Sequence, residues 1–171
     1  MRDDAFLCPE CGAVLNAATL VSPTGFDPSR VLSDRYVLLA LLGRGGMGAV
    51  WLAKDTQLDE VVAVKVLPTE VASDLRAVEW MKEEVRLART LRHDNIAAIY
   101  SFDVDHQKQT SFIVMEFIDG VDLHALLGKH KKEGGGGLPL GMVVELLAGM
   151  AAALDYAHSK RVIHRDIKPK N

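Results

Sequence analysis

Five short hydrophobic stretches alternate with turn-forming residues between residues 36 and 118. Each is rich in β-branched or aromatic residues, as strands are, and tight connections between short strands favour an antiparallel sheet. The stretches are YVLLALLG, GAVWLAKD, EVVAVKVL, IAAIYSFDV and TSFIVMEF. The pattern therefore predicts a five-stranded antiparallel sheet.

A helical period interrupts this pattern and later replaces it. Residues 75–93 predict an amphipathic helix, because hydrophobic residues recur there at spacings of three or four. These residues are Val78, Met81, Val85, Ala88 and Leu91. Residues 137–160 predict a second, more apolar helix, and we interpret the KHKKEGGGG stretch before it as a flexible surface loop.

The chain divides into three parts and predicts an α+β fold. Residues 1–34 hold a CPECG motif and a linker, residues 36–118 hold the sheet and one helix, and residues 119–171 are mainly helical. With 171 residues, of which 49% are hydrophobic and 25% charged, the chain can build a substantial core.

Charge and hydropathy exclude several classes of protein. A formal net charge of -3 leaves no broad basic surface for nucleic acid or anionic lipid. The N-terminus, MRDDAF, is acidic where a secretory signal would be basic. The apolar stretch from Leu138 to Tyr156 is interrupted by Glu145 and Asp155. We therefore expect a cytoplasmic chain with no membrane segment and no nucleic-acid partner.

The two cysteines, Cys8 and Cys11, form a C-x-x-C motif that is half of a zinc site. A structural zinc site needs four ligands, and no second C-x-x-C or suitably spaced His follows. Three interpretations remain open: a Zn²⁺ ion shared between two chains, which would make a homodimer, a remnant of a zinc ribbon, or a redox pair.

Gly43, Gly45 and Gly48 form a G-x-G-x-x-G motif that follows the first predicted strand. In a dinucleotide-binding fold a helix would open at the third glycine. Here the alternation of AVWLAKD predicts a strand, so the motif is expected at the tip of a hairpin. Such a tip brings backbone N–H groups close to phosphate oxygens, although a simple turn would also explain the glycines.

Lys65 lies inside a hydrophobic strand and shares a face with Ala63. A lysine in this setting needs a carboxylate partner unless its charged end reaches solvent at a sheet edge. Glu84 is the predicted partner, because the residues three and four positions away on its helix are apolar and it should face the core. An ion pair would leave Lys65 able to bind phosphate oxygens.

Functional side chains gather in the last eight residues, HRDIKPKN. They are His164, Arg165, Asp166, Lys168 and Asn171. Pro169 disfavours helix at the residue before it, which predicts a loop after the long helix. Loops on a rigid scaffold often carry catalytic residues, although a charged loop at a helix end needs no function.

Together these motifs, in this order, resemble those of protein kinases, and the GRGGMG and IVMEFIDG stretches are similar to bacterial Ser/Thr kinases of the Hanks type. The resemblance covers residues 36–171. It implies a kinase N-lobe, with a five-stranded sheet and one helix, followed by the first helices of the C-lobe as far as the catalytic loop.

The resemblance also implies a role for each motif in ATP-dependent phosphorylation of Ser or Thr in a protein substrate. The glycine loop would cover ATP, Lys65 would hold its phosphates and pair with Glu84, and Asp166 would accept the hydroxyl proton. Lys168 would contact the γ-phosphate and Asn171 would bind Mg²⁺. The adenine and ribose contacts implied are Val50, Ala63, Met115, Glu116 to Ile118, and Asp122.

Two functions remain open. The first is a Ser/Thr kinase, of which these 171 residues lack the D-F-G Asp and activation loop, so we expect this chain alone to be inactive. It should also expose an apolar patch on the long helix, comprising Leu146, Leu147, Met150 and Leu154. The alternative is a non-catalytic, pseudokinase-like module that binds nucleotide without transferring phosphate.

Overall fold

The computed structural model describes residues 5–7, 14–16, 30–46, 48–72, 74–132, 134 and 137–170. The chain forms two compact units. Unit 1 comprises Met1–Arg89 and Ile99–Phe117, and unit 2 comprises Thr90–Ala98 and Ile118–Asn171.

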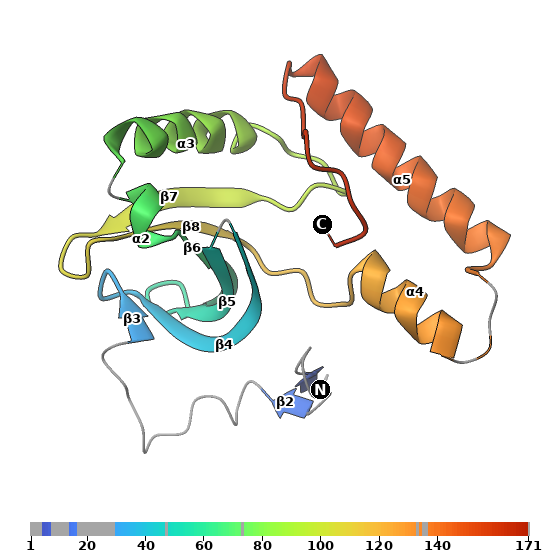
Figure 1. Cartoon of the computed structure of the whole chain (residues 1–171), viewed down its shortest axis with the longest axis horizontal. Coiled ribbons are helices and arrows are strands. Elements are labelled where there is room, and N and C mark those ends of the chain that lie inside the picture. Colours follow the sequence, from blue (N-terminus) through green and yellow to red (C-terminus); the bar gives the residue numbers. More distant parts are fainter. Residues whose placement is uncertain are drawn as a thin grey trace. The chain divides into compact units, whose positions relative to one another are not determined.

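Unit 1 is built on a six-stranded sheet in which every neighbouring pair is antiparallel (Figure 1). The strand order is β3-β4-β5-β6-β8-β7. Their bounds are β3 (Val31–Leu32), β4 (Tyr36–Gly45), β5 (Gly48–Asp55), β6 (Glu60–Val66), β7 (Ile99–Asp105) and β8 (Thr110–Glu116). The five predicted strands are confirmed, and the short strand β3 is an addition that the sequence pattern did not predict.

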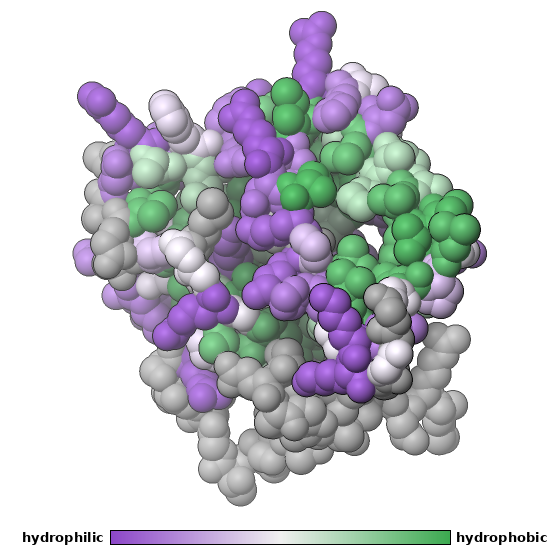
Figure 2. Space-filling view, turned by 45° about the vertical axis from the view of Figure 1, so that its right-hand side comes forward, coloured by the Kyte–Doolittle hydropathy of each residue, from purple (hydrophilic) through white to green (hydrophobic). Residues whose placement is uncertain are grey.

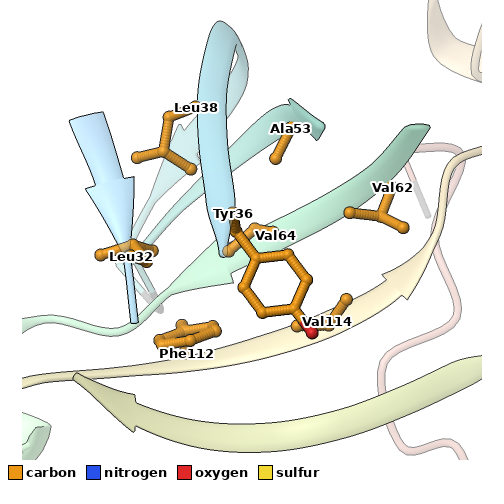
Figure 3. Packing of buried hydrophobic residues seen from close by; sticks show 8 residues of the cluster. All are labelled: Leu32, Tyr36, Leu38, Ala53, Val62, Val64, Phe112 and Val114. Carbon is orange, nitrogen blue, oxygen red and sulfur yellow. The ribbon is translucent and has the colours of Figure 1, made fainter. Parts of the chain in front are cut away.

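A hydrophobic cluster covers one face of this sheet. Its side chains point toward one another from β3, β4, β5, β6 and β8 (Figure 3). The members are Leu32, Tyr36, Leu38, Ala53, Val62, Val64, Phe112 and Val114, with Trp51 and Val66 packed against them. The Tyr36 and Phe112 rings meet edge to face with centroids 5.7 Å apart.

The turn between β3 and β4 is held by two buried carboxylates. Asp105 accepts a hydrogen bond from the backbone N–H of Ser33 at 2.9 Å. Burial raises the pKa of Asp105, but hydrogen bonds from backbone N–H groups and the nearby Lys108 charge together lower it by more. The pKa of Asp105 is therefore below its ordinary value. Asp55 accepts a forked pair of hydrogen bonds from Arg35, and this guanidinium lowers the pKa of the Asp55 carboxyl.

Two helices follow β6 in unit 1, the short α2 (Thr69–Ala72) and the longer α3 (Leu75–Ala88). Asp74 begins α3, since its side chain accepts hydrogen bonds from the next turn. The predicted hydrophobic stripe is confirmed along α3, where Val78 and Val85 are buried and Met81 and Ala88 half-buried. The helix ends at Ala88, earlier than the pattern indicated.

Unit 2 contains α4 (Leu123–Lys132) and α5 (Leu140–Ser159). The interpretation of KHKK as loop was wrong, because Lys129–Lys132 form the last turn of α4. Cationic side chains at that end interact favourably with the helix dipole, which helps the turn to form. The described part of α4 has no fully buried residue.

The long helix α5 exposes most of its hydrophobic side chains. Only Ala153 and Ala157 are buried, whereas Leu146 and Leu147 are exposed. The predicted patch is thus confirmed at these two leucines, while Met150 and Leu154 are half-buried. Figure 2 shows a large group of hydrophobic residues, in green, at the right of the view. By length and composition α5 could also cross a membrane, a test that core helices of soluble proteins pass as well.

The segment Thr90–Ala98 belongs to unit 2 because it is attached to α5. The Asn95 side chain donates a hydrogen bond to the backbone oxygen of Gly149 at 3.2 Å. The His93 ring lies 5.4 Å from the ring of Tyr156, whose hydroxyl accepts from the backbone N–H of Arg92. These contacts hold the connection between α3 and β7 against the long helix.

The N-terminal extension contains a small antiparallel pair, β1 (Ala5–Leu7) and β2 (Val14–Asn16). Cys8 and Cys11 fall between these strands and lie outside the described residues. The zinc interpretations therefore stay predictions.

Candidate active site

The G-x-G-x-x-G motif forms the tip of the β4–β5 hairpin, as predicted. The two strands pair up to Gly45 and Gly48, and register shifts in β4 bend the strand as it approaches the tip. Gly48 has φ +110°, and a Cβ placed there would stand 2.1 Å from the backbone oxygen of Val66. Only glycine fits this position, since both the backbone conformation and the close approach exclude a side chain.

The other two glycines of the motif have a different setting. Among the described residues, no atom lies within 4 Å of a Cβ built on Gly43 or Gly45, so the space beside the backbone is open to them there. Both residues are exposed. The hairpin tip can therefore bring backbone N–H groups to within hydrogen-bonding distance of a ligand's oxygen atoms.

Lys65 lies on the sheet face opposite the hydrophobic cluster. It is directly across from Val50 on β5 and from Ile113 on β8. Ala63, on the same face of β6, is likewise opposite Leu52 and Met115. The strand register thus brings four predicted site residues together on one face: Val50, Ala63, Lys65 and Met115.

The predicted ion pair between Lys65 and Glu84 is not formed. Within the part of the chain that the structure describes, neither side chain has a salt-bridge partner. Glu84 is exposed, so the expectation that it faces the core was wrong. Among the α3 residues whose burial is described, Val78 and Val85 are buried, and Glu84 lies about 100° around the helix from Val85. It therefore flanks the buried stripe.

The predicted adenine and ribose contacts continue past Met115 along the chain. Glu116 ends β8 in unit 1, and Ile118 is exposed at the start of the main part of unit 2. Asp122 accepts a hydrogen bond at 2.7 Å from the backbone N–H of Ala125, so its side chain caps the first turn of α4.

The predicted catalytic loop follows α5 as an irregular segment, residues 162–170, which is exposed from residue 163 onward. Arg165 has φ +64°, in the left-handed region, as have five other described non-glycine residues. The backbone N–H of Asp166 donates to Nδ1 of His164 at 3.2 Å. The Lys168 ammonium contacts the Asp166 carboxylate at 2.6 Å. Asn171 lies outside the described residues.

The described residues fit a nucleotide better than a metal ion alone. The backbone N–H groups at the hairpin tip, beside which the space is open at Gly43 and Gly45, and the ammonium group of Lys65 on β6 can donate to phosphate oxygens. No group of three or more His, Cys, Asp or Glu side chains in the described ranges could hold a metal. A metal ion would therefore depend on ligand oxygens together with few protein groups, as Mg²⁺ does in phosphoryl-transfer enzymes.

Sequence reasoning missed two residues of this face, Leu52 and Ile113. They are buried and lie in register with Ala63 and Lys65. The period-two alternation that starts at Val50 was sufficient to find Leu52. Ile113 required the strand order, which places β8 beside β6 and cannot be read from one strand alone.

Known proteins are similar to this chain over most of its length. The protein kinase domain family matches residues 36–171. The serine/threonine-protein kinase PknA of Mycobacterium tuberculosis is 36% identical over 143 residues, which are 82% of this chain and 32% of PknA. The probable serine/threonine-protein kinase SCO3848 of Streptomyces coelicolor is 39% identical over 147 residues, which are 85% of this chain and 21% of that protein.

Solved structures agree in fold. The crystal structure of the Mycobacterium tuberculosis PknI kinase domain superposes with a TM-score of 0.69 and 26% sequence identity. The superposition covers 86% of this chain and 57% of the PknI chain. The chain therefore spans only part of the kinases that it matches. On its sequence and its fold alike, it belongs to the protein kinase family, as a bacterial Hanks-type member.

Proposed function

We propose that this chain contributes the ATP-binding lobe and catalytic loop of a Ser/Thr protein kinase, which transfers the γ-phosphoryl group of ATP to a protein hydroxyl. The observation that carries the proposal is the face of the sheet on which Val50, Ala63 and Lys65 lie in register, below the glycine hairpin tip. An apolar surface for a base and a cation for phosphates are thus adjacent.

Each described residue has a role that its setting supports. Lys65, on a central strand, offers its ammonium to the α- and β-phosphates, and the hairpin tip offers backbone N–H groups. Asp166 accepts the hydroxyl proton of the substrate, and Lys168, which contacts it at 2.6 Å, holds its carboxylate in place. Asn171 would bind Mg²⁺. Bound MgATP would supply the phosphoryl group, and its Mg²⁺ ion would offset part of the negative charge on the phosphates.

Calorimetric titration of MgATP into the 171-residue chain tests the binding step. Lys65→Ala should weaken affinity by about tenfold or more, because a charge-assisted contact to phosphate is lost. Lys54→Ala is the matched control, since Lys54 lies on the neighbouring strand and pairs with Asp59 instead. Equal affinities for wild type and Lys65→Ala would contradict the proposal.

The 171 residues contain no D-F-G motif, whose Asp binds Mg²⁺ in protein kinases. We therefore propose that this chain by itself binds ATP and transfers little phosphate. Radiolabelled γ-phosphate transfer to a general protein acceptor, measured on protein of verified mass, tests this point. Rapid turnover that Asp166→Asn abolishes would contradict it.

A second candidate, nucleotide binding without transfer even in a longer chain, is favoured by one observation. Glu84 is exposed and does not pair with Lys65, although kinases require this pair for activity. Phosphate transfer by a chain extended through the rest of the kinase domain distinguishes the two candidates, measured on the wild type and on Glu84→Gln. Loss of transfer in that variant supports the kinase, and an extended wild type that binds ATP without transfer supports the second candidate.

A further inference from the structure

A groove open to solvent runs along one side of α4 in unit 2. Its cavity of about 480 Å³ is lined by His124, Ala125, Gly128, Lys129 and Lys132. Their spacing places them on one side of the helix. No atom of the described residues lies within 4 Å of a Cβ built on Gly128, so no described side chain fills the floor of the groove.

The groove is cationic at its far end. The last turn of α4 holds Lys129, His130, Lys131 and Lys132, and the helix contains no acidic residue. The three lysines are exposed, and the salt bridges among the described residues include none of them. The helix dipole explains cations anywhere in this turn. It does not explain why two small residues, Ala125 and Gly128, leave a channel that leads to Lys129 and Lys132.

The near end of the groove is attached to the catalytic loop. The backbone N–H of His124 donates to the backbone oxygen of Pro169 at 2.9 Å. Pro169 directly follows Lys168, which contacts Asp166. All these residues belong to unit 2. The groove therefore starts beside the loop that carries the proposed base and leads away from it.

We propose that this groove binds an acidic segment of the protein substrate, through Asp or Glu side chains that contact Lys129 and Lys132. The inference rests on the proposed kinase function and adds a substrate class to it. From His124 to Lys132 the helix rises about 12 Å, which an extended peptide covers in about four residues. The acidic residues would accordingly lie about three to six positions from the Ser or Thr held at Asp166.

The groove suits this partner in shape as well as in charge. Ala125 and Gly128 leave room for a peptide backbone, and the two lysines stand where its side chains would pass. Exposed lysine–carboxylate pairs are individually weak, so they are suited to discriminating among substrates and not to anchoring one tightly.

The test compares labelled peptides of equal length that carry one central Thr flanked by Glu, Gln or Lys. Fluorescence anisotropy with the 171-residue chain at low salt should give about threefold to tenfold tighter binding for the Glu peptide than for the Gln peptide. The double variant Lys129→Glu/Lys132→Glu should lose or reverse this preference. The matched control is Lys131→Glu, which makes the same charge change in the same turn outside the groove and should retain most of the preference.

Three results would overturn the inference: no discrimination by wild type, a preference that survives in the double variant, or an equal loss with Lys131→Glu. Displacement of the Glu peptide by a DNA oligonucleotide that binds more tightly would also overturn it, by identifying a general polyanion site. Circular dichroism checks that the helices persist. MgATP affinity on the same samples separates the proposals: a chain that binds ATP but does not discriminate peptides contradicts only this inference, and one that binds no ATP contradicts the proposed function.

Discussion

The two units of this chain bury their hydrophobic residues very differently. Unit 1 contains the cluster between its strands, in which Val64 and Phe112 are fully buried. In the described part of unit 2, the only buried hydrophobic residues are Leu91, Ala153 and Ala157. Its longest helix leaves Leu147 57% exposed, whereas Leu52 in unit 1 is 1% exposed.

This difference separates where the chain is stabilised from where it can do chemistry. Buried apolar area is the main source of folding free energy, so unit 1 should fold as a stable body that fixes the glycine hairpin and Lys65. The loop that holds Asp166 belongs to unit 2 and is exposed over residues 163–170. Nucleotide binding should therefore be robust in this chain, and the catalytic loop should be the less protected part of the site.

The largest effect should come from the core of unit 1. Phe112→Ala removes a side chain that is fully buried and contacts Tyr36, and it should lower the free energy of unfolding by about 3–5 kcal/mol. Urea titration followed by tryptophan fluorescence measures this, because Trp51 packs against the cluster. Leu147→Ala on α5 is the matched control and should change the same transition by less than about 0.5 kcal/mol. Equal effects would refute the comparison between the units.

The next largest effect is expected at the glycine hairpin. Gly48→Ala should lower the free energy of unfolding by about 2–3 kcal/mol, since the new Cβ would collide with the Val66 oxygen and φ is +110°. Gly45→Ala, in open space, should cost less than about 1 kcal/mol. The same urea titration measures both variants. A Gly48→Ala chain as stable as wild type would show that the hairpin tip adopts another conformation.

A smaller and pH-dependent effect is expected at Asp55. Its pKa is lowered chiefly by the Arg35 hydrogen bonds, so its contribution to stability is present above the ordinary carboxyl pKa of about 4 and is lost as pH falls through the lower folded value. Asp55→Asn should destabilise unit 1 by about 1–2 kcal/mol at neutral pH. The difference between wild type and variant should shrink on acidification below about pH 4, measured by urea titration across pH. A difference that stays constant with pH would contradict this assignment.

The smallest effect on the free energy of unfolding is expected on α5. Replacing the exposed Leu146 and Leu147 with Ser should leave the unfolding of unit 1 unchanged within about 0.5 kcal/mol. It should reduce binding of the dye ANS and lower self-association, because an exposed apolar patch is removed. Undiminished ANS binding would mean that the apolar surface lies elsewhere.

Much of unit 1 could be predicted because its signals are local. Strand alternation placed Lys65 opposite the apolar face, and the strand after Gly48 identified a hairpin. Strand β3 was missed because two residues are too short to show a period, and the turn that follows them is held by a distant carboxylate, Asp105, which accepts from the backbone N–H of Ser33.

The errors arose where tertiary contacts or helix ends decide the outcome. The apolar neighbours of Glu84 on α3 indicated a core position, but which side of the helix is buried depends on the strand it packs against, β7. The last turn of α4 was taken as loop because lysines and glycines follow one another there. Polar composition alone does not distinguish a solvated helix end from a loop.

Hydrogen exchange with and without MgATP tests the central claim most directly, since it reports every part of the chain at once. Nucleotide should slow exchange at the hairpin tip, residues 43–50, and along β6 around Lys65, with little change in the middle of α5. The Lys65→Ala chain should lose this protection at the same MgATP concentration. Protection that is absent from the hairpin tip, or that is unchanged in Lys65→Ala, would contradict the account of unit 1 as the ATP-binding lobe of a kinase.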